Sequence, residues 1–308
     1  MSSIPILDIR RFESDREAFL DEFRSAYQTW GFAGIRGHDL APELIQAAWR
    51  AAEKFFSLPS EVKRQYEGTE KDRSRGYIPL GVEKAKDSNH SDLKEFYHIG
   101  HINNAEGNFS ENIWPHESAE FQATFEALYT TLESLSLRVL SIFAAALELP
   151  LDYFDDRVKY GETLLRILHY PPIEDQDIPN LRAAAHEDIN LITLLAGSEQ
   201  DGLEVLSRQG EWVPINMIEG TIICNVGDML QRLSNAKFPS TTHRVVNPKG
   251  SKARTSRYSI PFFVHPGPEV SLDCLAGCVD DDHPKQFSEI TAGDYLEQRL
   301  KEIGLLKT

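Results

Sequence analysis

The chain has few cysteines. Cys224, Cys274 and Cys278 are the only ones among the 308 residues. Cys274 and Cys278 form a single C-x3-C pair, and no second pair is present in the sequence to complete a zinc site. A sparse, odd set of cysteines is typical of unpaired thiols in a reducing compartment, so we expect a cytoplasmic protein without disulfides.

The chain also lacks long apolar runs and an excess of basic residues. No run approaches the roughly 18 apolar residues that a membrane-spanning helix requires, and the N-terminus shows no secretory signal pattern. Lys and Arg number 32 against 48 Asp and Glu, which gives a formal net charge of −16. Such a charge repels phosphate backbones and anionic lipids. We therefore expect neither nucleic-acid nor membrane-surface binding.

What the chain does contain is the composition of a globular protein with a substantial core. Hydrophobic residues make up 41% and charged residues 26% of the sequence. The N-terminal part alternates between strand and helix patterns. Strand patterns occur in "IPILDI" and "GFAGIRG", and helix patterns occur in residues 14–30 and in "APELIQAAWRAAEKFFSLP", which ends at Pro59. Residues 66–115 are rich in Gly, Asn, Lys and Asp, which predicts a long irregular segment of the kind that is often functional.

In the second half of the sequence the pattern changes from a long helix to short strands. "ESAEFQATFEALYTTLESLSLRVLSIFAAALELP" carries apolar residues at helical spacing and predicts one long core helix. From about residue 160, short β-rich runs separated by turn residues predict a sandwich or jelly roll. Within this region "CNVGDML" predicts a tight turn at Gly227 and Asp228, and "TAGDYLEQRLKEI" predicts a closing helix.

The segment "AAAHEDINLITLL" places charged side chains at the head of an apolar run. Buried charge is costly unless something pairs with it, and a metal ion is one such partner; a surface turn is the alternative. Residues two apart on a strand point the same way, so His186 and Asp188 can face one ion while Glu187 points elsewhere. With His243 from "STTHRVVNP", they match the two-histidine, one-carboxylate set of non-haem Fe(II) oxygenases, which leaves coordination positions open for O2 and a co-ligand.

A second constellation lies in "RYSIPFF". Arg257 and Ser259 alternate on a predicted strand, so both side chains can face inward. A guanidinium beside a hydroxyl suits a carboxylate ligand. A buried arginine without such an anion would be expensive, so the metal set and the anion set support each other.

These segments together resemble the iron(II)- and 2-oxoglutarate-dependent oxygenases of the isopenicillin N synthase-like family. The resemblance spans nearly the whole chain. It implies an α+β fold with a double-stranded β-helix (jelly-roll) core, flanking helices and an N-terminal α/β region. The segments that carry it are "IPILDI", "WGFAGIRGH", "AAEKFFSLP", "LRILHYPP", "HEDINLITLL", "GLEVL", "GEWVPI", "GTIICNVGDMLQRLSNAKFPSTTHRVVNP" and "RYSIPFF". The expected division is residues 1–120 wrapping the core, 121–159 as the long helix, 160–270 as the oxygenase core and 271–308 as a C-terminal loop and helix.

The resemblance also implies a reaction and residue roles. A small-molecule substrate is oxidised by O2, through hydroxylation, desaturation or cyclisation, while 2-oxoglutarate is converted to succinate and CO2. By resemblance the iron ligands are His186, Asp188 and His243, and the residues that hold 2-oxoglutarate are Arg257, Ser259 and Tyr170.

Two alternatives stay open at the level of sequence. The oxidase that names the family carries the same Arg-x-Ser pair, directs it at its substrate and needs no 2-oxoglutarate. A non-enzymatic barrel with a structural metal is the other. For the substrate, we expect contacts from Arg166, Tyr77 and Phe96, although a surface ion pair for Arg166 and plain packing for the two aromatic residues are the competing interpretations. The sequence does not specify an oligomeric state.

Overall fold

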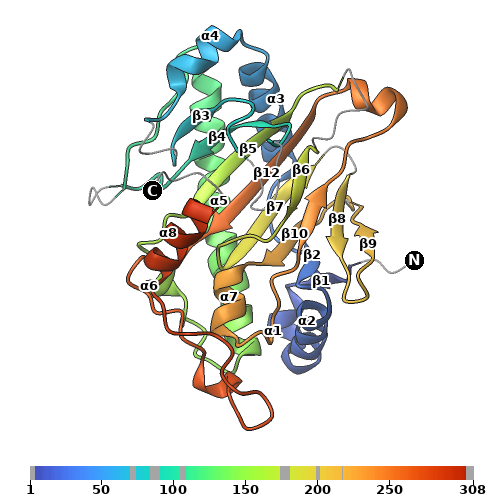
Figure 1. Cartoon of the computed structure of the whole chain (residues 1–308), viewed down its shortest axis with the longest axis vertical. Helices are drawn as coiled ribbons and strands as arrows, with labels where there is room; N and C mark the ends of the chain where they lie inside the picture. Colours follow the sequence, from blue (N-terminus) through green and yellow to red (C-terminus); the bar gives the residue numbers. More distant parts are fainter. Residues whose placement is uncertain are drawn as a thin grey trace.

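Two β-sheets face each other in this computed structural model, which describes residues 4–69, 74–83, 91–104, 109–173, 181–198, 202–216 and 218–302 (Figure 1). Most neighbouring strands are antiparallel, and β1 and β2 are parallel. The larger sheet has the order β1 (Ile6–Asp8), β2 (Phe32–Arg36), β10 (Ile222–Val226), β7 (Ile192–Ser198), β12 (Arg257–Val264), β5 (Leu164–Tyr170), β4 (Glu95–Ile99) and β3 (Gly76–Ile78). The smaller sheet has the order β6 (Ala183–His186), β11 (His243–Val245), β8 (Leu203–Leu206) and β9 (Trp212–Pro214).

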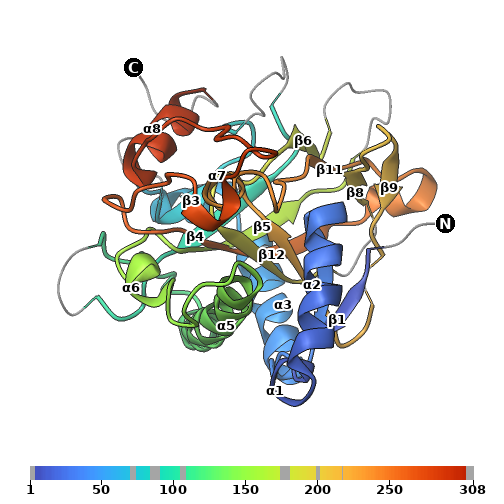
Figure 2. The same ribbon diagram turned by 90° about the horizontal axis from the view of Figure 1, so that it is seen from below.

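Helices cover the face of the larger sheet that looks away from the smaller one (Figure 2). The long helix α5 contacts β7 and β12, and α3 contacts β5 and β12. Their buried side chains join those of the sheet in the main hydrophobic core. The α-helices are α1 (Arg11–Ser14), α2 (Arg16–Trp30), α3 (Pro42–Phe56), α4 (Ser60–Lys63), α5 (Ala119–Ala146), α6 (Asp155–Val158), α7 (Asp228–Leu233) and α8 (Ala292–Glu302). Among the described residues no helix is both long and apolar enough to cross a membrane.

The alternation of side chains along the strands separates this core from an internal cavity. On β12, Ile260, Phe262 and Val264 pack toward the helices, whereas Arg257, Ser259 and Phe263 line the cavity between the sheets. The strands β5, β7 and β10 show the same two-residue period. Polar residues at the inward positions of apolar strands are therefore collected around one space.

Two small hydrophobic clusters join the sheets on either side of that space. One contains Phe32, Leu195 and Ile223 of the larger sheet with Leu203 and Val205 of β8. The other contains Phe96, Leu168 and Tyr170 of the larger sheet with Ala183 of β6 and Val245 of β11. The architecture is the jelly-roll core that the sequence predicts, and the family comparisons reported below agree with it.

Most of the predicted elements are confirmed, including the long helix and the closing helix. Residues 66–115 are not wholly irregular, since β3 and β4 lie within them. Every residue of β4 is buried, and its Glu95 is paired with Lys63. The charged residues in and around β4 are the reason why the sequence does not predict this core strand. Residues 70–73, 84–90 and 105–108 of this stretch lie outside the described residues.

One further local prediction is wrong. Gly227 and Asp228 do not form a tight turn between strands but begin α7, because Gly227 takes an extended N-cap conformation and Met229, Leu230 and Leu233 bury against the core. The helix predicted for residues 14–30 is confirmed as α2, with Asp15 at its N-cap, and the short helix α1 precedes it.

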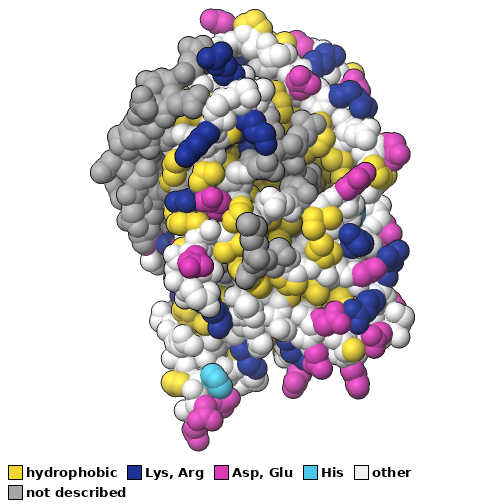
Figure 3. Space-filling view, turned by 90° about the vertical axis from the view of Figure 1, so that its right-hand side faces the viewer, with side chains coloured by type: hydrophobic (Ala, Val, Ile, Leu, Met, Phe, Trp, Pro, Cys, Tyr) yellow, Lys and Arg dark blue, Asp and Glu magenta, His cyan; other side chains and the backbone are white. Residues whose placement is uncertain are grey.

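Figure 3 shows one face of the molecule. Hydrophobic side chains gather near its middle, while Lys, Arg, Asp and Glu side chains lie mainly around its edges. Charges of both signs are interspersed there, so the net charge of −16 does not make this face uniformly acidic.

Candidate metal centre and ligand cavity

His186, Asp188 and His243 meet at one edge of the smaller sheet. His186 ends β6 and His243 begins β11, and the two are cross-strand partners. Their ring centroids are 4.4 Å apart. Asp188 lies beyond the end of β6, in the segment that leads to β7, so the strand alternation behind its prediction does not explain its direction. Its Oδ1 atom lies 4.0 Å from Nε2 of His186 and 3.8 Å from Nε2 of His243.

Both histidines present the same ring nitrogen to this point. Nδ1 of His186 lies 2.7 Å from the carbonyl oxygen of Ala184, and Nδ1 of His243 lies 3.1 Å from that of Thr241. A carbonyl oxygen only accepts, so each Nδ1 carries the proton and each Nε2 keeps its lone pair. This is the arrangement that second-sphere hydrogen bonds give to metal-binding imidazoles.

The carboxylate is oriented in the same way. Thr193 and Asn225 donate hydrogen bonds of 2.6 and 2.8 Å to Oδ2 of Asp188, and Asn190 donates to the Thr193 hydroxyl. Oδ1 is thus the oxygen left facing the two histidines. Glu187 turns away and accepts a hydrogen bond from Thr242. The donor set is two nitrogens and one oxygen within 4.8 Å of one another, which fits a divalent iron held on one face.

Burial and mutual proximity shift the titration of His186 and Asp188. Burial, with the neighbouring His243, lowers the pKa of His186 to about 4. Burial alone would raise the pKa of Asp188, but His243, His186 and the two hydrogen bonds outweigh it and lower that pKa. The site therefore offers a neutral imidazole at His186 and an ionised carboxylate at Asp188 at neutral pH, as metal binding requires.

Arg257, Ser259 and Tyr170 lie together at another part of the same cavity. Arg257 and Tyr170 are cross-strand partners, and the guanidinium carbon lies 5.0 Å from the centre of the tyrosine ring. Arg257 is 2% exposed, and its Nε and Nη1 atoms have no hydrogen-bond partner among the described residues. Burial lowers its pKa. A buried guanidinium with two unused donors beside a hydroxyl fits the carboxylate of a bound acid.

Arg166 also lines the cavity, on the inward face of β5. It is not a surface residue with a chance ion pair. Its side chain is 15% exposed, and its Nη1 lies 3.2 Å from Oε2 of Glu83. Nε donates to Nε2 of His98 at 2.7 Å, and the guanidinium lies over the ring of Phe96 at 4.4 Å.

The other two residues predicted for the substrate do not line this cavity. Phe96 is buried beneath Arg166. Tyr77 is buried in the main core and donates its hydroxyl to Glu95.

Several residues around the site were not predicted from the sequence. Thr193 and Asn225 are polar residues at inward positions of the apolar strands β7 and β10, a signal that could have identified them. Lys94 lines the cavity from just before β4. Arg182 is fully buried, and its guanidinium lies 6.0 Å from the Tyr170 ring; burial and the nearby Arg257 lower its pKa to about 10.

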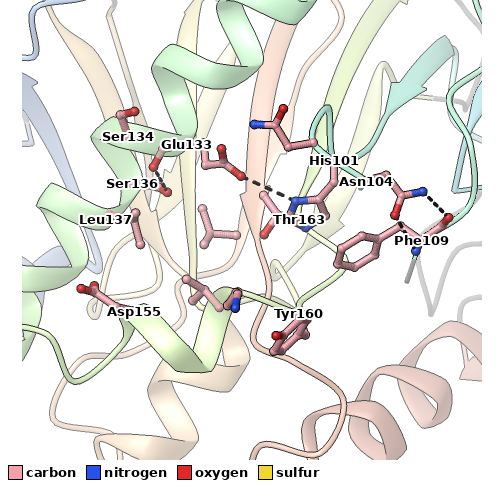
Figure 4. A pocket seen from close by; sticks show the side chains of 14 residues that line it. His101, Asn104, Phe109, Glu133, Ser134, Ser136, Leu137, Asp155, Tyr160 and Thr163 are labelled. Carbon is pink, nitrogen blue, oxygen red and sulfur yellow. Dashed lines mark hydrogen bonds and ion pairs between the residues drawn. The ribbon is translucent and has the colours of Figure 1, made fainter. Parts of the chain in front are cut away.

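A larger cavity lies elsewhere, between α5, α6 and the segment around His101 (Figure 4). His101 faces Glu133 there, with Nδ1 3.6 Å from Oε1, and its ring stacks on Phe109. In the part of the chain that the structure describes, His186, Asp188 and His243 form the one group of three metal-ligating side chains. The larger cavity contains none of the residues predicted for the site.

Comparison with known proteins gives consistent results. Residues 4–117 match the family described as non-haem dioxygenase in morphine synthesis N-terminal, and residues 161–266 match the 2OG-Fe(II) oxygenase superfamily. The 2-oxoglutarate-Fe(II) type oxidoreductase hxnY of Emericella nidulans is 31% identical over 97% of this chain and 89% of its own length. The proline hydroxylase buaE of Petromyces alliaceus is 33% identical over 92% of this chain and 93% of its own.

Solved structures are similar over nearly the whole length. A 2OG-Fe(II) oxygenase family protein from Caulobacter crescentus has a TM-score of 0.88 and 42% identity, covering 98% of this chain and 100% of its own. A full-length Neurospora crassa protein in complex with alpha-KG and thymine has a TM-score of 0.84 and 29% identity, covering 97% of this chain and 96% of its own.

Proposed function

This chain belongs to the iron(II)- and 2-oxoglutarate-dependent oxygenases of the isopenicillin N synthase-like family, and on that premise we propose a role for each residue around its cavity. The enzyme is a dioxygenase that oxidises a small molecule with release of succinate and CO2. Iron bound with 2-oxoglutarate supplies the oxidising power from O2. The protein supplies the ligands, the orientation of the co-substrate and the shape of the cavity.

His186, Asp188 and His243 are the proposed iron ligands. They would bind through the two Nε2 atoms and Oδ1, the atoms that their own hydrogen bonds leave available. Thr193 and Asn225 hold the carboxylate so that a single oxygen faces the metal.

Arg257, Ser259 and Tyr170 are the proposed 2-oxoglutarate residues. The observation that carries this role is the unused pair of donors on a guanidinium that is 2% exposed and shares a cavity with the triad. An anion is the partner that such a group needs, because an unpaired buried charge is strongly destabilising.

For the substrate we propose direct contact by Arg166 and an indirect role for Phe96, whose ring supports the guanidinium. Tyr77 acts further away, by holding Glu95. Two similar proteins support a small polar substrate: one is named as a proline hydroxylase, and the other was solved in complex with thymine. We further propose the four-part division of the chain at residues 120, 159 and 270, and a cytoplasmic location, which the three free thiols favour.

The test is 2-oxoglutarate turnover, measured as succinate formed by the purified protein with Fe(II), ascorbate and O2. The wild type is expected to form succinate only with iron present, and Asp188→Ala to form none above the protein-free background. Glu187→Ala is the matched control, because it removes the adjacent carboxylate that points away from the site. Equal succinate formation by Asp188→Ala and wild type would exclude the assigned ligand.

A further inference from the structure

Two arginines reach the cavity from neighbouring strands, and only one of them is paired with protein carboxylates. Arg257 on β12 and Arg166 on β5 both occupy inward positions of the larger sheet. No carboxylate among the described residues pairs with Arg257, and its Nε and Nη1 find no acceptor within that part of the chain. Arg166, by contrast, belongs to a cluster that already contains its counter-charges.

That cluster holds two cations and two carboxylates. Lys94 lies 3.0 Å from Glu83 and 2.9 Å from Asp92, and Arg166 lies 3.2 Å from Glu83. Lys94 and Asp92 are buried, and the side chain of Glu83 is 13% exposed. Burial opposes ionisation, but Arg166 and Lys94 still hold the pKa of Glu83 well below its usual range, and Glu83 and Asp92 raise that of Lys94 despite its burial. The two cations are thus matched by two carboxylates, and the formal charge of the cluster is zero.

The charges that line the rest of the loaded cavity would cancel as well. The charge of Fe(II) and that of Arg257 would be balanced by Asp188 and the two carboxylates of 2-oxoglutarate, since imidazoles bind metals in their neutral form. Arg182, a further buried cation nearby, is not among the residues that line the cavity. An anionic substrate would add an uncompensated charge to a largely buried space, which is unfavourable.

The guanidinium of Arg166 nevertheless keeps one donor group for a ligand. Nε donates to His98 and Nη1 to Glu83, and Nη2 donates to no described residue. The guanidinium carbon lies 4.4 Å from the ring centre of Phe96 and 5.3 Å from that of Phe263. These contacts and the two hydrogen bonds hold the remaining donor in one direction. Phe263 itself lines the cavity, which offers an apolar surface next to the donor.

We propose that the substrate is a neutral molecule that presents a carbonyl or amide oxygen to Nη2 of Arg166 and packs an apolar face against Phe263. This rests on the proposed function, since it concerns the substrate end of the same cavity. Arg166 is then a specificity-determining residue that donates a hydrogen bond to an uncharged oxygen, while Arg257 binds a carboxylate.

The experiment measures binding of matched amide and acid probes to the anaerobic Fe(II)·2-oxoglutarate holoenzyme by calorimetry. The pairs are benzamide and benzoate, nicotinamide and nicotinate, and cyclohexanecarboxamide and cyclohexanecarboxylate. In the pairs that bind, the amide is expected to have a Kd at least about tenfold lower than the acid, the range of one hydrogen bond to a charged group. Arg166→Gln and Arg166→Lys are both expected to lose this preference and to keep binding 2-oxoglutarate. Arg166→Lys should lose it because lysine keeps the positive charge but lacks the planar, forked donor geometry of the guanidinium.

Tighter binding of the acids, failure of every amide to bind, or an unchanged preference in a folded Arg166 variant would each overturn the proposal. The visible charge-transfer band of the Fe(II)·2-oxoglutarate complex separates this outcome from failure of the proposed function. If the band forms and the acids bind better, only the substrate class is wrong. If the wild type forms no band, the proposed function fails first.

Discussion

Arg257 and Arg166 show how one residue type serves two ligands within one cavity. Both are inward-facing arginines on neighbouring strands, and both stack on an aromatic ring, Tyr170 or Phe96. They differ in their partners, because Arg166 is paired with Glu83 whereas Arg257 has two donors without any acceptor among the described residues. Neutralisation by the surrounding residues, more than the presence of a cation, determines whether a ligand must be an anion.

Removing the metal ligand Asp188 is expected to have the largest effect, because both 2-oxoglutarate binding and turnover depend on bound iron. Asp188→Ala should lose Fe(II) binding in an anaerobic titration and all substrate-dependent turnover. Glu187→Ala should bind iron as the wild type does. Retention of stoichiometric iron by Asp188→Ala would show that the two ends are not organised around this site.

Arg257→Met is expected to break the anion end alone. Two charge-assisted hydrogen bonds to a carboxylate are lost, so the Kd for 2-oxoglutarate should rise by about 100-fold or more, with iron affinity nearly unchanged. Arg254→Met, which removes an exposed arginine close by in the sequence, serves as the control. A change in 2-oxoglutarate affinity of less than about threefold would remove Arg257 from its role.

Thr193→Val should have a smaller effect, on the metal and not on either arginine. The hydroxyl that orients Asp188 disappears, so iron affinity is expected to fall by about 10–100-fold. Thr193→Ser keeps the hydroxyl and should recover most of the loss. If valine and serine variants bind iron equally, the hydrogen bond to Oδ2 does not position the ligand.

Glu83→Gln removes a carboxylate that pairs with Arg166, so the surroundings of Arg166 become more like those of Arg257. Losing one carboxylate leaves the cluster with a net positive charge, so the preference for amides over acids should shrink by up to about tenfold. Asp281→Asn changes the net charge of the protein equally at an exposed position and should leave the preference as it was. A preference unaffected by Glu83→Gln would mean that charge balance does not select the substrate.

The smallest expected effect is that of pH on this selectivity. The pKa of Glu83 is held low and that of Lys94 is raised, so neither group changes its charge near neutrality. For a carboxyl whose folded pKa is depressed, the associated stability is present above its unfolded pKa and is lost as the pH falls through the folded one. The ratio of amide to acid affinity should therefore stay constant from about pH 6 to 8 for probes that do not titrate there. A steep change would mean that another group controls the preference, such as the His98 imidazole that accepts a hydrogen bond from Nε of Arg166.

Much of the fold and of the metal site could be predicted from the sequence because the information is local or carried by the resemblance. Short β-rich runs between turn residues predict β5, β7, β10 and β12, and the order of His186, Asp188 and His243 indicates the ligand set. The direction of Asp188 could not be predicted by strand alternation, because it lies past the end of β6 and is set by Thr193 and Asn225.

The neutral cluster around Arg166 was beyond prediction for a different reason. The stretch that contains Glu83, Asp92 and Lys94 is rich in charged residues, so the sequence predicts an irregular segment there and does not predict the strand β4. Their pairing with Arg166 depends on contacts between segments far apart in the sequence. Composition gives the charges of such residues but not which of them cancel.

The most direct test of the account is an anaerobic titration of Fe(II) into wild type, Arg257→Met and Arg166→Gln, each with and without 2-oxoglutarate, while the visible charge-transfer band is recorded. A band is expected in the wild type only when both iron and 2-oxoglutarate are present. It should be lost in Arg257→Met at 2-oxoglutarate concentrations that saturate the wild type, and retained in Arg166→Gln. Loss of the band in Arg166→Gln with retention in Arg257→Met would reverse the assignment of the two arginines and contradict the account.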